Sequence, residues 1–120
     1  MNRLKLFIVF LLAATSVAAQ QKTYFVSPSG NDTADGLSVK TAWKTLDKIN
    51  STEFQPGDKI LLESGKAWYG QLKLKGSGAD GQPVIISSYG GEKRPIINIG
   101  RAEGAGILID NQSWWHVENM

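Results

Sequence analysis

Residues 56–89, with the sequence PGDKILLESGKAWYGQLKLKGSGADGQPVIISSY, decide the fold, because short apolar runs alternate with turn-forming residues. Pro56-Gly57-Asp58 predicts a turn that leads into a strand over residues 59–63. Further strands are predicted over residues 71–75, where leucines alternate with lysines, and over residues 83–89. Glycine-rich turns separate these runs, so the stretch predicts β-structure.

The same rhythm continues to the end of the chain, with strands predicted over residues 95–99, 106–110 and 114–117. The strands start roughly 8 to 12 residues apart, which fits a sandwich or barrel and also fits a parallel β-helix. In a β-helix, the strands that start at Lys59, Gln71 and Pro83 would form one coil. The strands that start at Pro95, Gly106 and Trp114 would form the next coil. Periodicity alone does not choose between these architectures.

Upstream of this region, the pattern predicts a strand, a polar loop and a helix. The strand covers residues 23–27 and the loop covers residues 28–36. The helix is predicted over residues 42–50, with Thr41 as its N-cap. Three apolar residues recur every third position and would form its buried face: Trp43, Leu46 and Ile49.

The first 19 residues have the pattern of a signal peptide. Arg3 and Lys5 give a positive start, residues 6–14 are apolar, and Val17 and Ala19 stand where a signal peptidase requires small residues. The apolar run is too short to cross a bilayer, which takes about 20 residues. We therefore expect a mature protein that starts at Gln20, has no membrane span and is secreted or periplasmic.

Composition excludes several classes of function. The chain has 13 basic residues, two of which lie in the leader, so the mature part has 11 basic and 11 acidic residues and no net charge. This balance, without a basic cluster, predicts no nucleic-acid partner. The absence of cysteine excludes disulfides, thiolate catalysis, zinc-thiolate sites and a lipid-anchored exported form.

The order of the segments resembles exported right-handed parallel β-helix proteins of the pectate-lyase-like superfamily. Residues 24–32, followed by Gly36, resemble their opening segment, and residues 43–50 resemble their capping helix. Residues 56–62 resemble the strand that opens the first coil. Three later segments resemble the strands that follow: residues 68–72, 81–86 and 113–119.

The resemblance implies an all-β fold, a right-handed parallel β-helix or solenoid with an N-terminal capping helix and first coils. The resemblance divides the chain into a signal peptide (residues 1–19), a strand, loop and capping helix (residues 20–58), and the first coils of the β-helix (residues 59–120). Because the sequence stops at Met120 inside an apolar pattern and a solenoid normally needs at least about three repeats, we expect a truncated chain.

The resemblance also implies a polysaccharide partner. Many members of the superfamily cleave acidic polysaccharides by β-elimination, often with calcium, and others hydrolyse glycosides, with reacting groups on central coils that are absent here. We therefore assign no catalytic, cofactor-binding or metal-binding residue, and we expect this part of the protein to be inactive alone. The alternatives are a non-enzymic carbohydrate-binding or adhesin solenoid and, less favoured, a free-standing sandwich domain.

Trp114 and His116 are candidates for parts of a site. His116 is the sole histidine and thus the obvious general-base candidate. If Trp115 and Val117 point inward, His116 and Trp114 point outward. We favour a surface histidine without a catalytic role, and we regard a sugar contact by Trp114 as the less favoured alternative to packing under a loop.

Acidic and glycine-rich segments are further candidates for a calcium site, a phosphate-binding loop or catalytic carboxylates. Asn31, Asp32, Asp35 and Gly36 offer oxygen ligands of the kind calcium takes, but they also form turns by bonding their own backbone, which is the interpretation we favour. Residues 76–81 lack the Lys-Ser/Thr of a phosphate loop and are interpreted as a turn. No spacing pairs the remaining acidic candidates as glycoside hydrolysis requires: Asp58, Glu63, Asp80 and Asp110.

Overall fold

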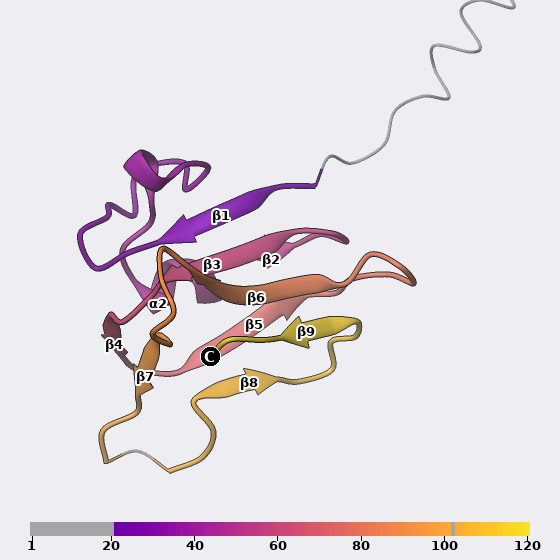
Figure 1. The fold of residues 1–120 in the computed structure, drawn as a ribbon. Coiled ribbons are helices and arrows are strands. Elements are labelled where there is room, and N and C mark those ends of the chain that lie inside the picture. Colours follow the sequence, from indigo (N-terminus) through magenta and orange to yellow (C-terminus); the bar gives the residue numbers. More distant parts are fainter. Residues whose placement is uncertain (1–20, 102) are drawn as a thin grey trace, which may run out of the picture.

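A computed structural model describes residues 21–101 and 103–120. The predicted signal peptide lies outside these residues. The described elements are two short helices and nine strands (Figure 1): β1 (Thr23–Val26), η1 (Val39–Thr41), α2 (Leu46–Asn50), β2 (Glu53–Phe54), β3 (Lys59–Glu63), β4 (Ala67–Tyr69), β5 (Leu72–Gly76), β6 (Val84–Tyr89), β7 (Ile96–Asn98), β8 (Ile107–Ile109) and β9 (Trp115–Val117).

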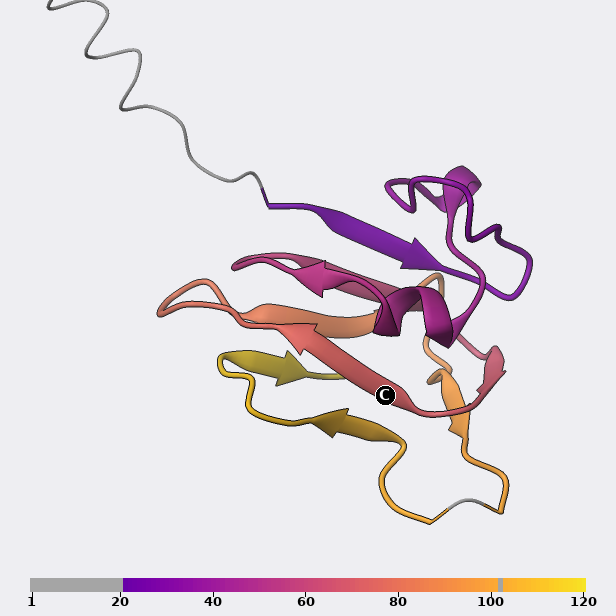
Figure 2. The same cartoon turned by 180° about the vertical axis from the view of Figure 1, so that it is seen from behind.

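The described strands form three sheets in which every strand pair is parallel. The four-stranded sheet has the order β1-β3-β6-β9, the three-stranded sheet β2-β5-β8, and the two-stranded sheet β4-β7. From β3 onward the chain visits the three sheets in turn, and β6 returns beside β3 (Figure 2). The predicted all-β parallel fold is confirmed at this level.

The predicted grouping of strands into coils was wrong. The strands that start near Lys59 and Pro83 are neighbours in one sheet, because Lys59 pairs with Ile85, and Val84 in turn pairs with Trp115. The strand β2 was missed, and the periodic pattern did not identify β4 as a separate strand. Residues 68–72, which the resemblance assigned to a strand, overlap β4 and the start of β5. With β4 included, β3, β4 and β5 form one round of the three sheets, and β6, β7 and β8 form the next.

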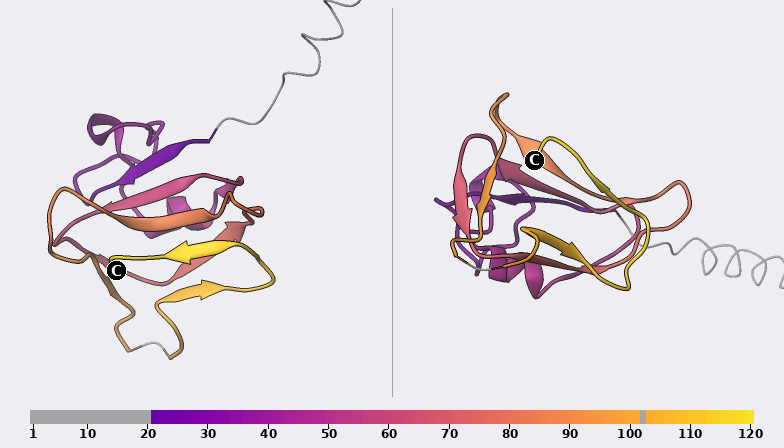
Figure 3. Two further views of the ribbon diagram at one scale, coloured as in Figure 1. Left: turned by 45° about the vertical axis from the view of Figure 1, so that its right-hand side comes forward. Right: turned by 90° about the horizontal axis from the view of Figure 1, so that it is seen from below.

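The three sheets surround a common interior (Figure 3). Their inward-facing side chains form one buried cluster there. In β3 every second residue is buried, as the side-chain alternation of a strand requires. In β6 the alternation holds for Val84 and Ile86, and the neighbouring Ser87 is buried as well. Each aliphatic side chain buried in this way contributes about 1.5–3 kcal/mol of transfer free energy. The buried cluster consists of Val26, Trp43, Leu46, Ile49, Phe54, Ile60, Leu62, Trp68, Leu72, Leu74, Val84 and Ile86.

The predicted helix is shorter than expected, although its apolar face is confirmed. Trp43, Leu46 and Ile49 are all buried, but α2 starts at Leu46 and its N-cap is Thr45, whose side chain accepts a hydrogen bond from the N–H of Lys48. The preceding segment cannot be helical, because Trp43 forms a parallel bridge with Val26 instead.

The outer edge of β1 is covered by the loop that follows it. Phe25 donates its N–H to the carbonyl of Gly36 at 2.7 Å, and Trp43 donates to the carbonyl of Phe25 at 2.9 Å. Asn50, at the end of α2, similarly covers the edge of β5, where it donates to the carbonyl of Gln71 and accepts from the N–H of Lys73. The cap thereby satisfies backbone groups that an open sheet edge would expose.

The opposite end of the three sheets is open within the described residues. β7, β8 and β9 each stand last in their sheets and pair on one side only. Apolar side chains are exposed there, namely Leu108 and Val117, each about two-fifths exposed. In the described part of the chain, no helix is long and apolar enough to cross a membrane.

Candidate functional site

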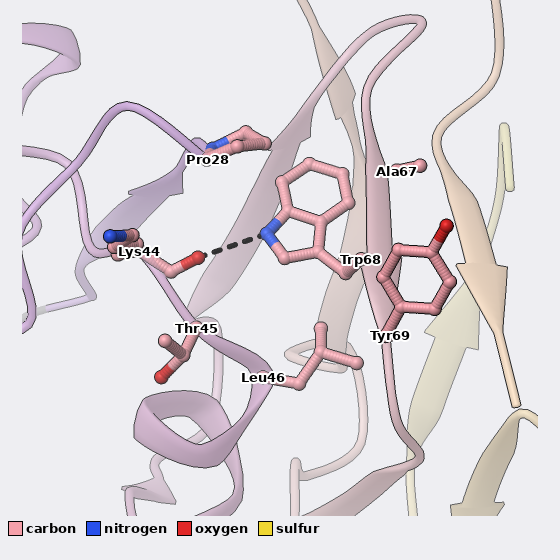
Figure 4. A pocket seen from close by; sticks show the side chains of 7 residues that line it. All are labelled: Pro28, Lys44, Thr45, Leu46, Ala67, Trp68 and Tyr69. Carbon is pink, nitrogen blue, oxygen red and sulfur yellow. Dashed lines mark hydrogen bonds between the residues drawn. The ribbon is translucent and has the colours of Figure 1, made fainter.

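A pocket of about 220 Å³ lies between β4 and the segment that leads into α2 (Figure 4). Trp68 lies at its centre, and its indole N–H donates to the carbonyl of Lys44 at 3.0 Å. The indole is almost fully buried. The pocket is mainly apolar, with two polar residues on one wall, and is lined by Pro28, Lys44, Thr45, Leu46, Ala67, Trp68 and Tyr69.

The alternation of β4 separates its side chains into two groups. Trp68 points inward, whereas Ala67 and Tyr69 point to the other side of the strand (Figure 4). Tyr69 is 79% exposed. Since Trp68 already provides the aromatic contact to the core, the Tyr69 ring has no comparable packing role.

The free edge of β4 faces the pocket. β4 pairs with β7 on one side only. On that side the carbonyl of Lys66 accepts a hydrogen bond from the N–H of Ile96, and the N–H of Gly70 donates to the carbonyl of Asn98. Because parallel pairing uses alternate residues, the backbone polar groups of Ala67 and Tyr69 point to the opposite edge. Among the described residues these groups have no hydrogen-bond partner across the pocket.

The strand β7 extends the exposed face beside Tyr69. In the register of the two strands, Ala67 lies opposite Ile96 and Tyr69 lies opposite Asn98. Ile96 is 54% exposed. We call the four outward-facing residues Ala67, Tyr69, Ile96 and Asn98 the outer face of the two-stranded sheet.

Polar groups also meet at the ends of β1, β3 and β6. Glu63 accepts a hydrogen bond from the hydroxyl of Ser27 at 2.5 Å, and Tyr89 lies opposite Glu63. Partial burial and the charge of Glu63 raise the pKa of the Tyr89 hydroxyl, although its hydrogen bond with Ser27 acts in the other direction. This cluster links three strands and leaves the hydroxyl of Tyr89 protonated at neutral pH.

In the loop that contains the candidate calcium ligands, the side-chain oxygens of Asn31 and Asp35 accept hydrogen bonds from residues that follow them closely in the sequence. The Oδ1 of Asn31 accepts from the N–H and hydroxyl of Thr33, and the Oδ1 of Asp35 accepts from the N–H of Leu37 and the hydroxyl of Thr41. Gly36 lies against the ring of Trp43, where a Cβ would come within 2.7 Å. The favoured interpretation, turn formation, is confirmed for these residues.

Asp32 ties the same loop to the start of α2. One of its oxygens accepts the N–H groups of Lys44 and Thr45, and the other accepts the hydroxyl of Thr45 at 2.6 Å. Partial burial raises the pKa of this carboxyl, but the three hydrogen bonds and the charge of Lys48 outweigh that effect and lower it overall.

His116 lies on β9 and points outward, opposite Ile85. Its Nε2 lies 3.3 Å from a carboxylate oxygen of Glu118, and both side chains are about half exposed. Trp115 packs inward, where its indole N–H donates to the carbonyl of Gly76 at 2.8 Å. Trp114 is 55% exposed. Trp115 therefore points inward and His116 outward, as predicted, whereas Val117 is 43% exposed and does not join the buried cluster.

The scattered carboxylates lie on separate elements. Asp58 is buried and accepts the N–H groups of Lys22 and Gln55, while Asp80 and Asp110 are exposed. Gly76 is the last residue of β5, and residues 77–81 lie in the loop between β5 and β6. Within residues 21–101 and 103–120, no three His, Asp or Glu side chains gather in a group that could hold a metal.

Sequence reasoning missed Tyr69 and Asn98. The available signal was the triplet Ala67-Trp68-Tyr69 between two glycines, Gly65 and Gly70, which allows a three-residue strand with one buried and two outward residues. The pairing of β4 with β7, which places Tyr69 beside Asn98, has no signature in the sequence.

The solved structures that are similar to this chain include two of a GH136 lacto-N-biosidase from Eubacterium ramulus, a glycoside hydrolase. The selenomethionine derivative has a TM-score of 0.71 and 28% identity, over 82% of this chain and 20% of that chain. The native protein has a TM-score of 0.69 and 26% identity, with the same coverage. This chain therefore spans about a fifth of the length of the structures it matches.

No model of a protein family matches the chain, and no curated protein matches it. The structural likeness agrees with the parallel β fold described above.

Proposed function

We propose that this chain forms the first coils of a right-handed parallel β-helix that acts on carbohydrate as a glycoside hydrolase. The observation that carries the proposal is the likeness to the GH136 lacto-N-biosidase, at 28% identity and a TM-score of 0.71 over 82% of this chain. Parallel connections between strands of one sheet are almost always right-handed, which supports the handedness.

The proposal extends to the cellular location and the reaction class. The leader pattern of residues 1–19 supports export, with a mature start at Gln20. The similar structures favour hydrolysis over the lyase chemistry that the sequence resemblance also allowed. The described strands correspond to about a fifth of the similar structures, so we place the reacting carboxylates of the proposed hydrolase on further coils.

The test is hydrolysis of an aryl lacto-N-bioside by the protein expressed from its complete reading frame. We expect release of the aryl alcohol and of the disaccharide. Formation of an unsaturated product from acidic polysaccharides, with no aryl alcohol released, would assign the protein to the lyases. Binding of oligosaccharides without turnover of either substrate would support the non-enzymic alternative.

A further inference from the structure

The outer face of the two-stranded sheet has the composition of a binding surface. On the inner side of this sheet Trp68 is buried in the core. On the outer side Tyr69 is 79% exposed and Ile96 is 54% exposed. An exposed aromatic residue beside further apolar surface contributes little to the core and is typical of interaction sites.

Polar groups surround this apolar face. Asn98 uses its Oδ1 to accept the N–H of Gly100 at 2.8 Å, and within the described residues its Nδ2 has no acceptor. The backbone groups of Ala67 and Tyr69 line the free edge of β4, and Lys44 and Thr45 stand on the opposite wall of the pocket (Figure 4). An aromatic plane ringed by hydrogen-bonding groups complements a sugar ring, which has C–H faces and a rim of hydroxyls.

The dimensions favour one ring over an extended chain. The pocket of about 220 Å³ is smaller than the ~300–1,000 Å³ of sites for drug-sized ligands. A peptide that adds a strand to a sheet requires an edge along which several residues can pair. The free edge of β4 belongs to a three-residue strand and presents the backbone groups of two residues only.

We propose that the outer face of the two-stranded sheet, together with the pocket at the free edge of β4, is a subsite for a single sugar ring. The ring stacks on Tyr69, and its hydroxyls bond to the Nδ2 of Asn98 and to the backbone of β4. The assignment of the ligand as a sugar, and not as another small ring compound, rests on the proposed function. The subsite binds a sugar unit of the substrate without taking part in bond cleavage.

The test measures binding of free lacto-N-biose and of N-acetylglucosamine by NMR titration of the complete protein, with no turnover required. We expect shifts of the Trp68 indole N–H and the Asn98 side-chain amide. Tyr69→Ala should weaken binding at least about tenfold, the equivalent of ~1.4 kcal/mol, whereas Tyr69→Phe should retain it because the ring is kept. Neither change should alter the melting temperature, since the side chain is exposed.

Trp114→Ala is the matched control, since it removes another exposed aromatic side chain from a different part of the surface. It should bind as the unchanged protein does. The proposal is overturned if Tyr69→Ala binds normally, if neither sugar shifts the two signals, or if Trp114→Ala alone loses binding. If the unchanged protein hydrolyses no aryl lacto-N-bioside but binds the sugars through Tyr69, the proposed function is contradicted and the subsite stands. If it hydrolyses that substrate but Tyr69→Ala binds the sugars normally, the proposed function stands and the subsite is overturned.

Discussion

Asp32 shows how one side chain sets where a helix begins. Its two oxygens accept three hydrogen bonds from Lys44 and Thr45, which hold these residues in extended backbone just before α2. We expect Asp32→Ala to lower the free energy of unfolding by about 1–3 kcal/mol, because the donors lose their acceptor. Chemical denaturation measures this, with Asp80→Ala as the control at an exposed acidic residue. An equal loss in both variants would contradict the role of Asp32.

The lowered pKa of Asp32 also predicts a pH dependence. In the unfolded chain an aspartate titrates near pH ~3.9, so the folded carboxylate contributes stability above that pH and loses it as the pH falls through its lower folded pKa. Asp32→Asn should therefore show a smaller fall in melting temperature between about pH 5 and pH 2 than the unchanged protein. Parallel curves for the two proteins would exclude this contribution.

Gly76 and Gly90 form a natural comparison at the residue scale. Both have a similar positive φ, 95° and 92°, which disfavours any residue with a Cβ. A Cβ at Gly76 would lie 2.1 Å from the carbonyl oxygen of Phe54, whereas one at Gly90 would meet nothing within 4 Å. We expect Gly90→Ala to cost about 1 kcal/mol and Gly76→Ala to cost clearly more, as measured by chemical denaturation. Equal costs would mean that the β2–β5 contact adjusts freely.

At the scale of elements, α2 serves as a cover for the three-stranded sheet. Leu46 and Ile49 are buried, and Asn50 bonds to both sides of Leu72 through Gln71 and Lys73. We expect Leu46→Asp to destabilise the protein by several kcal/mol, because it buries an unpaired charge, and to give insoluble or protease-sensitive protein. Leu37→Asp, at a side chain that is 45% exposed, is the control. Normal solubility and melting of Leu46→Asp would refute the covering role.

The elements differ in how well sequence predicts them. The three-residue spacing of Trp43, Leu46 and Ile49 correctly identified a buried face, because packing against the core imposes that period. It misplaced the start of the helix, since Trp43 is held by a bridge to Val26 that depends on residues distant in sequence. The strands around Leu62 and Leu72 were found because their apolar patterns are long enough to show.

The candidate site could not be predicted in the same way. β4 has only three residues, too few for a periodic signal, and a tyrosine in a strand is as consistent with a core position as with a surface one. The exposure of Tyr69 follows from Trp68 taking the inward position, and its neighbour Asn98 follows from the β4–β7 register. Both depend on tertiary pairing, which residue type alone does not specify.

At the scale of the whole molecule, the two ends of the stacked sheets are unlike. The loop over residues 28–45 and α2 cover one end, whereas β7, β8 and β9 present one unpaired edge each among the described strands. Open edges pair readily with other chains. We expect residues 20–120, produced as a separate protein, to associate in a concentration-dependent way, as measured by light scattering coupled to size-exclusion chromatography.

A charge at this end should reduce the association. Val117→Lys places a charge on β9, the last strand of the four-stranded sheet, at a side chain that is 43% exposed. Val39→Lys places the same charge in the loop at the covered end and should leave the association unchanged. A monomeric residue 20–120 protein that unfolds cooperatively would show that the open strand edges do not drive association.

The register of the sheets has a consequence for how the chain folds during synthesis. Thr23 pairs with Lys59, Lys59 with Ile85, and Val84 with Trp115. About thirty further residues must therefore be synthesised before the partner of each strand is present. The loops between paired strands have similar lengths, so the entropy lost on closing them hardly changes from one pairing to the next. Ribosomes add ~5–20 residues per second, so each new strand emerges beside a template that has already formed. The described part of the chain can therefore grow by repeated addition, with each new strand pairing with the strand formed one round earlier.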